Sequence, residues 1–226
     1  MRHKHFPAAA ALGLLLQGCA PLTPAFQTGP NAEVTHDGLT RVDNTRLQAV
    51  WLRPDIDLTP YTGMILENAG VEFRPTRANG GTDNAYPLTE TDKERFVELV
   101  SEEFRSALSE SERFEIVTAP GPDVLLVRGS LLDVISSVPP RESGRTEAFL
   151  RQVGEATLVI EVYDSQSGAI LARAAERRAA EDLSGRPTRV YTGQGWELVR
   201  DLARLWARTF REGLEELATT GFPPAA

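Results

Sequence analysis

The most regular pattern of hydrophobic and polar positions lies near the end of the chain, from about residue 195 to 219. Apolar side chains recur there every three or four residues, and charged side chains fill the other half of the helical wheel. This pattern predicts a long amphipathic helix that packs against a sheet. Its apolar stripe contains Trp196, Val199, Ala203, Trp206, Phe210, Leu214 and Leu217.

A second amphipathic helix is predicted after Thr89. Thr89 is followed three residues later by Asp92, which resembles a capping box with aspartate in place of glutamate. Glu103 falls inside the apolar arc, where we expect it to reach the edge of the arc or to pair with an arginine; a functional carboxylate is the alternative. The apolar positions are Phe96, Val97, Leu99, Val100, Phe104, Ala107 and Leu108.

Extended segments account for most of the remaining pattern, because apolar residues either alternate with polar ones or form short runs between Gly, Pro and Asn. The segments are residues 47–52, 61–66, 71–75, 114–117, 123–135, 156–163 and 169–174. The turn Asn68-Ala69-Gly70 is expected to separate the second from the third, and residues 164–168 to close a hairpin between the last two. Residues 136–152 are predicted to form an exposed loop of unassigned role.

The order strand, helix, strands with a hairpin, helix predicts an α+β fold. We expect a mostly antiparallel sheet of about four to six strands, with the two amphipathic helices packed on one face. This single domain is predicted over residues 46–219, with a C-terminal tail at 220–226.

The beginning of the chain carries an export signal at residues 1–18, with a basic start and a short apolar run. Leu16-Gln17-Gly18-Cys19 resembles the lipobox of bacterial lipoproteins. The resemblance implies that Cys19 receives a diacylglyceryl group and becomes the new N-terminus after cleavage. Two or three acyl chains hold a protein firmly at a membrane. An ordinary secretory signal with a chance cysteine is the alternative.

The residues after Cys19 bear on location. Ala20 is not the aspartate that would favour retention in the inner membrane, so the outer membrane, on its periplasmic side, is expected. Residues 20–45 contain several Pro and Gly and show no regular period, so residues 19–45 are predicted to be an acylated cysteine followed by a flexible tether.

Composition narrows the range of functions. Lys+Arg number 24 against 32 Asp+Glu, and the net charge of −8 disfavours nucleic-acid binding, which needs clustered cations. The hydrophobic fraction of 41% is typical of a globular protein. A single cysteine excludes a disulfide framework and a thiolate metal cluster.

The chain contains few residues of the types that commonly act in catalysis. After cleavage His36 is the one histidine and Lys93 the one lysine, and no phosphate-binding glycine motif occurs. We therefore predict no catalytic residue, no metal site and no cofactor. Carboxylates remain, and a glycosidase-like pair would first be sought at Asp133, Glu161 and Asp164.

The order and spacing of several segments resemble a family of bacterial lipoproteins, domain of unknown function 3313. The matching segments are Trp51-Leu52-Arg53-Pro54, Val71-Glu72-Phe73-Arg74-Pro75, residues 119–125, residues 162–168 with Ile170-Leu171-Ala172, Trp196, and Trp206-Ala207. The resemblance covers about residues 46–217 and implies a lipid-anchored envelope protein with no catalytic residues to carry over.

These features predict a non-catalytic outer-membrane lipoprotein that binds other envelope proteins, including a second copy of itself, as an assembly or transport accessory. A binder of a small molecule or lipid between helices and sheet is the alternative, and a carboxylate-dependent cell-wall hydrolase is the second alternative. A stripe of arginines on the last helix is a candidate partner contact or a solvated face with intrahelical ion pairs; it contains Arg200, Arg204, Arg208 and Arg211.

Overall fold

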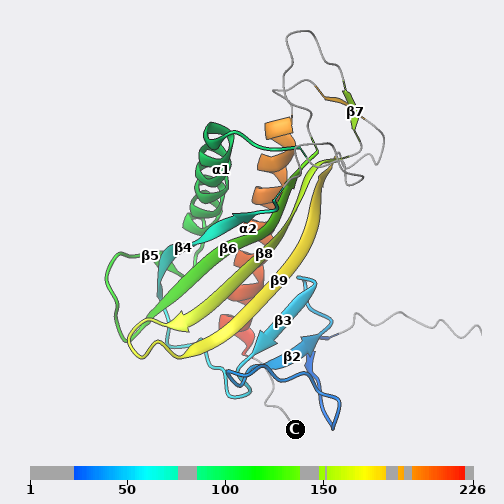
Figure 1. The fold of residues 1–226 in the computed structure, drawn as a ribbon. Helices are drawn as coiled ribbons and strands as arrows, with labels where there is room; N and C mark the ends of the chain where they lie inside the picture. Colours follow the sequence, from blue (N-terminus) through cyan, green and yellow to red (C-terminus); the bar gives the residue numbers. More distant parts are fainter. Residues whose placement is uncertain are drawn as a thin grey trace, which may run out of the picture.

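Two helices and an eight-stranded sheet make up most of the computed structural model, which describes residues 23–75, 86–137, 148–150, 152–181, 188–190 and 195–221 (Figure 1). The helices are α1 (Glu90–Ser109) and α2 (Gly195–Thr220). The strands of the main sheet are β1 (Ala25–Phe26), β2 (Thr40–Asp43), β3 (Ala49–Leu52), β4 (Gly63–Phe73), β5 (Glu115–Ile116), β6 (Val124–Ser136), β8 (Gln152–Asp164) and β9 (Ile170–Glu181). The short strands β7 (Ala148–Leu150) and β10 (Thr188–Val190) pair with each other.

The sheet is mixed, in the order β1-β2-β3-β9-β8-β6-β4-β5. Strand β4 is parallel to both of its neighbours, β6 and β5, whereas the other pairs are antiparallel. A parallel pair needs a long crossover, and α1 supplies it between β4 and the strands that follow. The α+β class is confirmed, but the mostly antiparallel sheet of four to six strands is corrected to a mixed sheet of eight.

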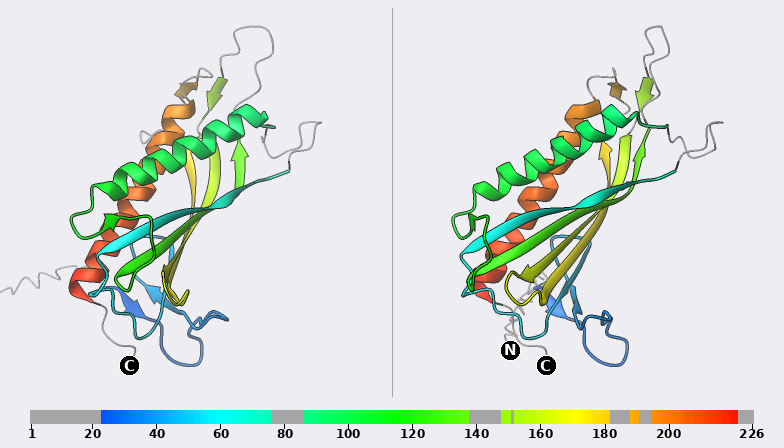
Figure 2. Two further views of the ribbon diagram at one scale, coloured as in Figure 1. Left: turned by 90° about the vertical axis from the view of Figure 1, so that its left-hand side faces the viewer. Right: turned by 60° about the vertical axis from the view of Figure 1, so that its left-hand side comes forward.

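Both helices lie on the same side of the sheet in the views of Figures 1 and 2. The alternation along β8 explains which side they cover. Leu158, Ile160 and Val162 are buried toward the helices, and the alternate residues Glu161 and Tyr163 point to the other side. Within the described residues the second side has no helix over it, and we call it the open face of the sheet.

The structure confirms several predicted elements. The Thr89 hydroxyl caps α1 by accepting a hydrogen bond from the Asp92 backbone N–H at 3.1 Å. The β8–β9 hairpin turns at Gly168, whose φ of 69° is in the left-handed region that glycine tolerates. The two extended pieces expected around Asn68-Ala69-Gly70 are instead one strand, β4, with an irregularity between Asn68 and Gly70.

The predicted tether is the largest correction to the fold. Residues 23–45 are part of the domain, because β1 and β2 extend the sheet and Leu39 and Val42 are 0% and 1% exposed. Proline and glycine in this segment form turns between short strands, and a strand of two to four residues is too short to show a period. The folded part therefore begins well before Arg46. The predicted loop 136–152 begins at the end of β6, contains β7 and ends at the start of β8, and its residues 138–147 and 151 lie outside the described residues.

Candidate functional site

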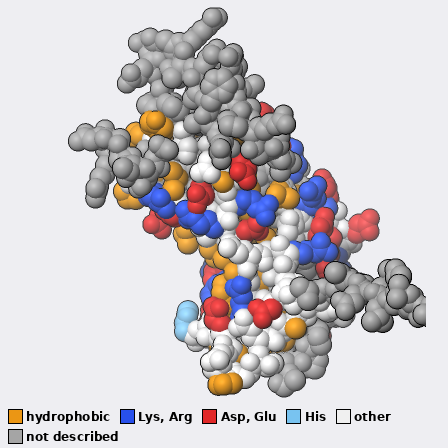
Figure 3. All heavy atoms as spheres, turned by 90° about the vertical axis from the view of Figure 1, so that its right-hand side faces the viewer, with side chains coloured by type: hydrophobic (Ala, Val, Ile, Leu, Met, Phe, Trp, Pro, Cys, Tyr) orange, Lys and Arg blue, Asp and Glu red, His pale blue; other side chains and the backbone are white. Residues whose placement is uncertain are grey.

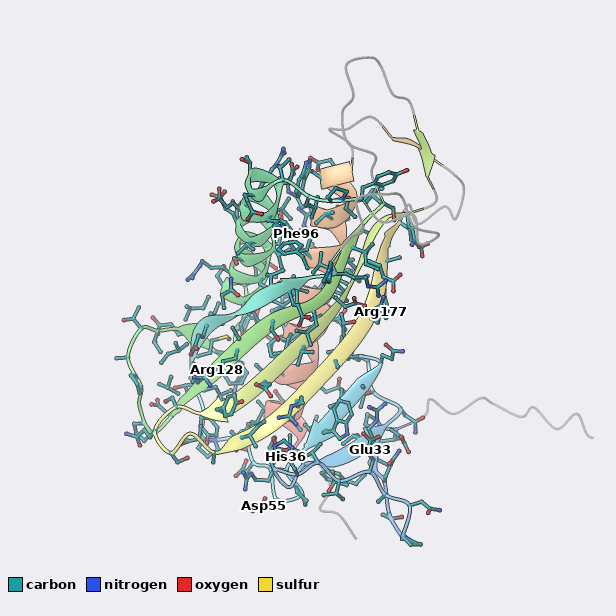
Figure 4. All side chains as sticks on the ribbon, in the orientation of Figure 1. Glu33, His36, Asp55, Phe96, Arg128 and Arg177 are labelled. Atoms are coloured by element: carbon teal, nitrogen blue, oxygen red, sulfur yellow. The ribbon has the colours of Figure 1, made fainter. Side chains whose placement is uncertain are left out.

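The apolar face of α2 lines two successive cavities between the helices and the sheet. The upper cavity, of about 530 Å³, lies at the N-terminal half of α2 against the far ends of β6, β8 and β9. Phe96, labelled in Figure 4, lines this cavity from α1, and the guanidinium of Arg95 lies 4.6 Å from the ring centroid of Trp196. The lining on α2 comprises Gly195, Trp196, Val199, Leu202, Ala203 and Trp206.

The lower cavity, of about 450 Å³, lies at the C-terminal half of α2, against β2, β3, β8 and β9. Val42, Val50 and Ile160 line the sheet side. Arg46 stands at its edge and forms ion pairs with Glu216 at 3.1 Å and Glu212 at 3.5 Å. The lining on α2 comprises Thr209, Phe210, Gly213, Leu214, Glu216, Leu217 and Thr220.

Both volumes exceed ordinary packing voids. Protein interiors are close-packed, with few voids larger than a water molecule. Both cavities are partly open to solvent, so their space is that of a groove at the surface and not of an enclosed void. Pockets of about 300–1,000 Å³ are typical for small ligands. The two cavities therefore have the size and lining of binding sites for apolar molecules.

The open face carries a row of side chains at matching register positions across six strands. This charged row consists of Arg41, Trp51, Arg173, Glu161, Arg128 and Glu67. The Arg173 guanidinium forms ion pairs with Glu161 at 2.8 Å and with Asp37 at 2.6 Å. Because Asp37 precedes β2, these ion pairs hold that segment against the sheet. Figure 3 shows positive and negative side chains interspersed on the side of the molecule at the right of Figure 1.

The hydrogen bond from the Thr35 hydroxyl and the contact with Arg173 together lower the pKa of Asp37 to about 2. The folded state therefore favours the ionised carboxylate. The ionised Asp37 therefore stabilises the folded state. This stabilisation is fully present above the pKa of an aspartate in the unfolded chain, near 3.9, and is lost as the pH falls through the folded-state pKa of about 2.

We expect Asp37→Asn to lower the free energy of unfolding near pH 7 by about 1–2 kcal/mol, since the side chain is only 22% exposed. The free energy of unfolding of this variant should also depend less steeply on pH between about pH 4 and pH 2. Urea unfolding at a series of pH values measures both effects. Asp55→Asn, at an exposed aspartate, is the control and should show the same pH dependence of stability as the unsubstituted protein. If Asp37→Asn also showed that pH dependence, the role given to Asp37 would be contradicted.

The three predicted carboxylates each have hydrogen-bond or ion-pair partners among the described residues. Asp133, at a φ of 55° in a bulge of β6, pairs with Arg74 and with Arg177, which together lower its pKa to about 2. Glu161 pairs with Arg173. Figure 4 shows Arg177 and Arg128 on the sheet.

Asp164, the third predicted carboxylate, shapes the hairpin turn. Its side chain accepts hydrogen bonds from the Ser167 backbone N–H at 2.7 Å and from the Tyr61 hydroxyl at 2.9 Å. The Ser167 contacts are the main reason that the pKa of Asp164 is lowered. Each predicted carboxylate thus has a structural partner of its own.

The predicted arginine stripe lies mainly between the helices. Arg200 and Arg204 each pair with Glu103 of α1 at 3.2 Å, and Arg211 pairs with Glu110 at 2.8 Å. The expectation that Glu103 pairs with an arginine is confirmed. The intrahelical pairs Arg200–Glu197 and Arg204–Asp201 also form. Arg208 is exposed, and no described contact tests the stripe as a partner surface.

Cys19, the predicted lipidation site, lies outside the described residues. Among the described residues no group of three or more His, Cys, Asp or Glu side chains is placed to hold a metal ion. In the same part of the chain, neither helix combines the length and the apolar character that crossing a bilayer requires.

The lower cavity could not be placed from the sequence, because part of its wall comes from the segment interpreted as a tether: Thr23, Pro24, Val42 and Thr45. One signal was present: Gly213 interrupts an otherwise strong helical pattern. A glycine inside a helix costs about 1 kcal/mol relative to alanine, which raises the question of what the position accommodates.

The family described as "Protein of unknown function (DUF3313)" matches residues 32–210, which is more than half of the chain. The match begins inside the predicted tether, in agreement with the folding of β2 into the sheet. No curated protein matches the sequence.

Several solved structures are distantly similar. Protein XCC0632 from Xanthomonas campestris is 9% identical, over 74% of this chain and 90% of that one, with a TM-score of 0.40. The PelC dodecamer from Paraburkholderia phytofirmans is 11% identical, over 66% and 88%, with a TM-score of 0.28. Rare lipoprotein B from Shewanella oneidensis is 15% identical, over 70% and 96%, with a TM-score of 0.26. Similarity at this level carries no argument about function.

Proposed function

The chain belongs to the DUF3313 family, and from this premise we propose that it is a lipoprotein whose domain binds an apolar ligand and catalyses no reaction. The anchor is Cys19, and the location is the outer membrane, on its periplasmic side. The lipobox-like Leu16-Gln17-Gly18-Cys19 supports the anchor, and Ala20 supports the location. The proposal includes no metal, cofactor or nucleic acid.

The observation that carries the binding function is the pair of cavities along α2. Their walls are mainly aliphatic and aromatic, and together they follow the apolar stripe of the helix from Trp196 to Leu217. An apolar molecule fills such a space without leaving a polar group unpaired. The alternative function expected from the sequence, a binder of a small molecule or lipid, therefore has the stronger geometric support.

Extraction of the native protein tests this proposal. We expect full-length acylated protein, purified from bacterial envelopes in mild detergent, to release a non-covalently bound apolar molecule at close to one equivalent per protein. Solvent extraction followed by mass spectrometry identifies it. An unrelated lipoprotein purified in parallel is the control, and extracts of identical composition from the two proteins would refute the proposal.

A second candidate is the function expected first, binding of other envelope proteins or of a second copy. The open face favours it, because it has no helix over it among the described residues and Leu132 on β6 is 38% exposed there. Crosslinking in intact envelopes tests this candidate. Failure to recover a reproducible partner, together with a strictly monomeric particle in detergent, would argue against it.

A further inference from the structure

We propose that the lower cavity holds a fatty acyl chain of a lipid from the bilayer to which the protein is anchored. The inference rests on the proposed anchor at Cys19, and it adds the ligand class, the source of the ligand and the cavity that takes it. The structure contributes three observations: the position of the cavity along the chain, its lining and the open space at Gly213.

The N-terminal segment of the domain brings the proposed anchor close to the lower cavity. Thr23 and Pro24 line the lower cavity, and Cys19 precedes Thr23 by four residues. Four residues span at most about 14 Å when fully extended. A lipid on Cys19 would therefore hold this end of the domain close to the membrane surface, instead of letting it stand clear on a long tether.

The lining suits a chain that has no polar atoms. Val42, Val50 and Val162 on the sheet face Phe210 and Leu217 on α2. The charged groups stand at the edge, where Arg46 pairs with Glu216 and Glu212. Arg173 also contributes to the lining, and its guanidinium pairs with Asp37 and Glu161, so each arginine that lines the cavity has an acidic partner.

Gly213 leaves the middle of the cavity wall open. It lies in the centre of the residues with which α2 lines the cavity, and a Cβ built at this position would meet no atom within 4 Å. No neighbouring atom therefore requires a glycine at this position. A glycine inside a helix lowers stability by about 1 kcal/mol relative to alanine. A larger side chain here would occupy the space that we assign to the acyl chain.

The energetics explain why the source is the anchoring bilayer. Burial of an acyl chain from water contributes about 0.8 kcal/mol per methylene. An acyl chain that moves from a bilayer into the cavity gains little of this free energy, because lipid tails are as apolar as the cavity wall. Occupancy then depends on the local supply of lipid, which is highest where the anchor keeps the cavity against a membrane.

Photocrosslinking tests the inference. Acylated full-length protein is reconstituted in phosphatidylethanolamine vesicles that contain a trace of the same lipid with a diazirine at the end of one acyl chain. We expect crosslinks on residues 209–220 and 42–52. Gly213→Phe should reduce them at least fivefold, and Gly213→Ala, the matched control, should leave them unchanged. Gly213→Leu replaces the phenylalanine variant if thermal unfolding shows that the latter does not fold.

Three results would overturn the inference. The crosslinks could lie elsewhere on the domain, or they could be equal in the phenylalanine and alanine variants. In cells fed a photoactivatable palmitate, α2 could also crosslink to the acyl group of Cys19 itself, which would assign the cavity to the protein's own anchor. The intact mass of the same sample reports acylation separately: an unmodified Cys19 would refute the proposed anchor, whereas altered crosslinks in acylated protein concern the cavity alone.

Discussion

Cys19→Ser is expected to abolish lipid attachment, since serine has no sulfur to accept a diacylglyceryl group and the lipoprotein peptidase acts after that step. The precursor should then keep residues 1–18 and incorporate no labelled palmitate. Metabolic labelling and the intact mass of the purified protein measure the two effects. This change should also remove the mature protein from the outer-membrane fraction of a density gradient.

The control for this prediction is Gly18→Ala, which keeps a small residue before the cysteine and should leave processing intact. Normal cleavage of Cys19→Ser, or a bare sulfur on the unsubstituted protein, would contradict the anchor. Recovery of acylated protein in the inner-membrane fraction would contradict the location alone.

Gly154→Ala is expected to destabilise the domain by about 2–4 kcal/mol, in the upper range for a single substitution. Gly154 on β8 lies opposite Ser136 of β6, next to the bulge between Leu132 and Ile135. A Cβ at Gly154 would lie 2.5 Å from the backbone oxygen of Ile135. The contact is with the backbone of a central strand, so neither side can move away without disrupting the ladder.

The midpoint of urea unfolding measures this effect, because a loss of stability at constant slope shifts the midpoint in proportion. Gly129→Ala is the matched control: Gly129 lies on the neighbouring strand β6, and a Cβ there would meet nothing within 4 Å. We expect its stability to change by no more than about 0.5 kcal/mol. Equal midpoints for the two variants would show that β6 and β8 can separate at the bulge.

The sequence predicted best where many residues repeat one pattern. Twenty or more positions define each helix, and the cap at Thr89 is a local interaction between residues three apart, so both could be predicted without the fold. The same holds for the β8–β9 hairpin, whose strands alternate over many positions around one turn. Pairing of Glu103 with an arginine also followed from its place within an apolar arc.

The parallel pairing of β4 with β6 was missed, although the order strand, helix, strand was visible. Whether a strand lies parallel or antiparallel to another depends on where the crossover helix packs. The pattern of apolar and polar residues within the strand carries no information about this packing. The strands β1 and β2 were missed because two to four residues cannot show a period. Arg173 and Asp37, 136 positions apart, become partners only when that segment folds onto the sheet.

By itself the sequence determined the helices, the main strands, the α+β class and the lipobox-like Cys19, because each is encoded by neighbouring residues. The tertiary structure alone decided that residues 23–45 belong to the domain, that three arginines of α2 pair with α1, and that the apolar face of α2 stands over two cavities. These features depend on which distant segments meet. A hydrophobic pattern shows that a face will be buried, but the space left beside that face is set by the placement of the elements around it.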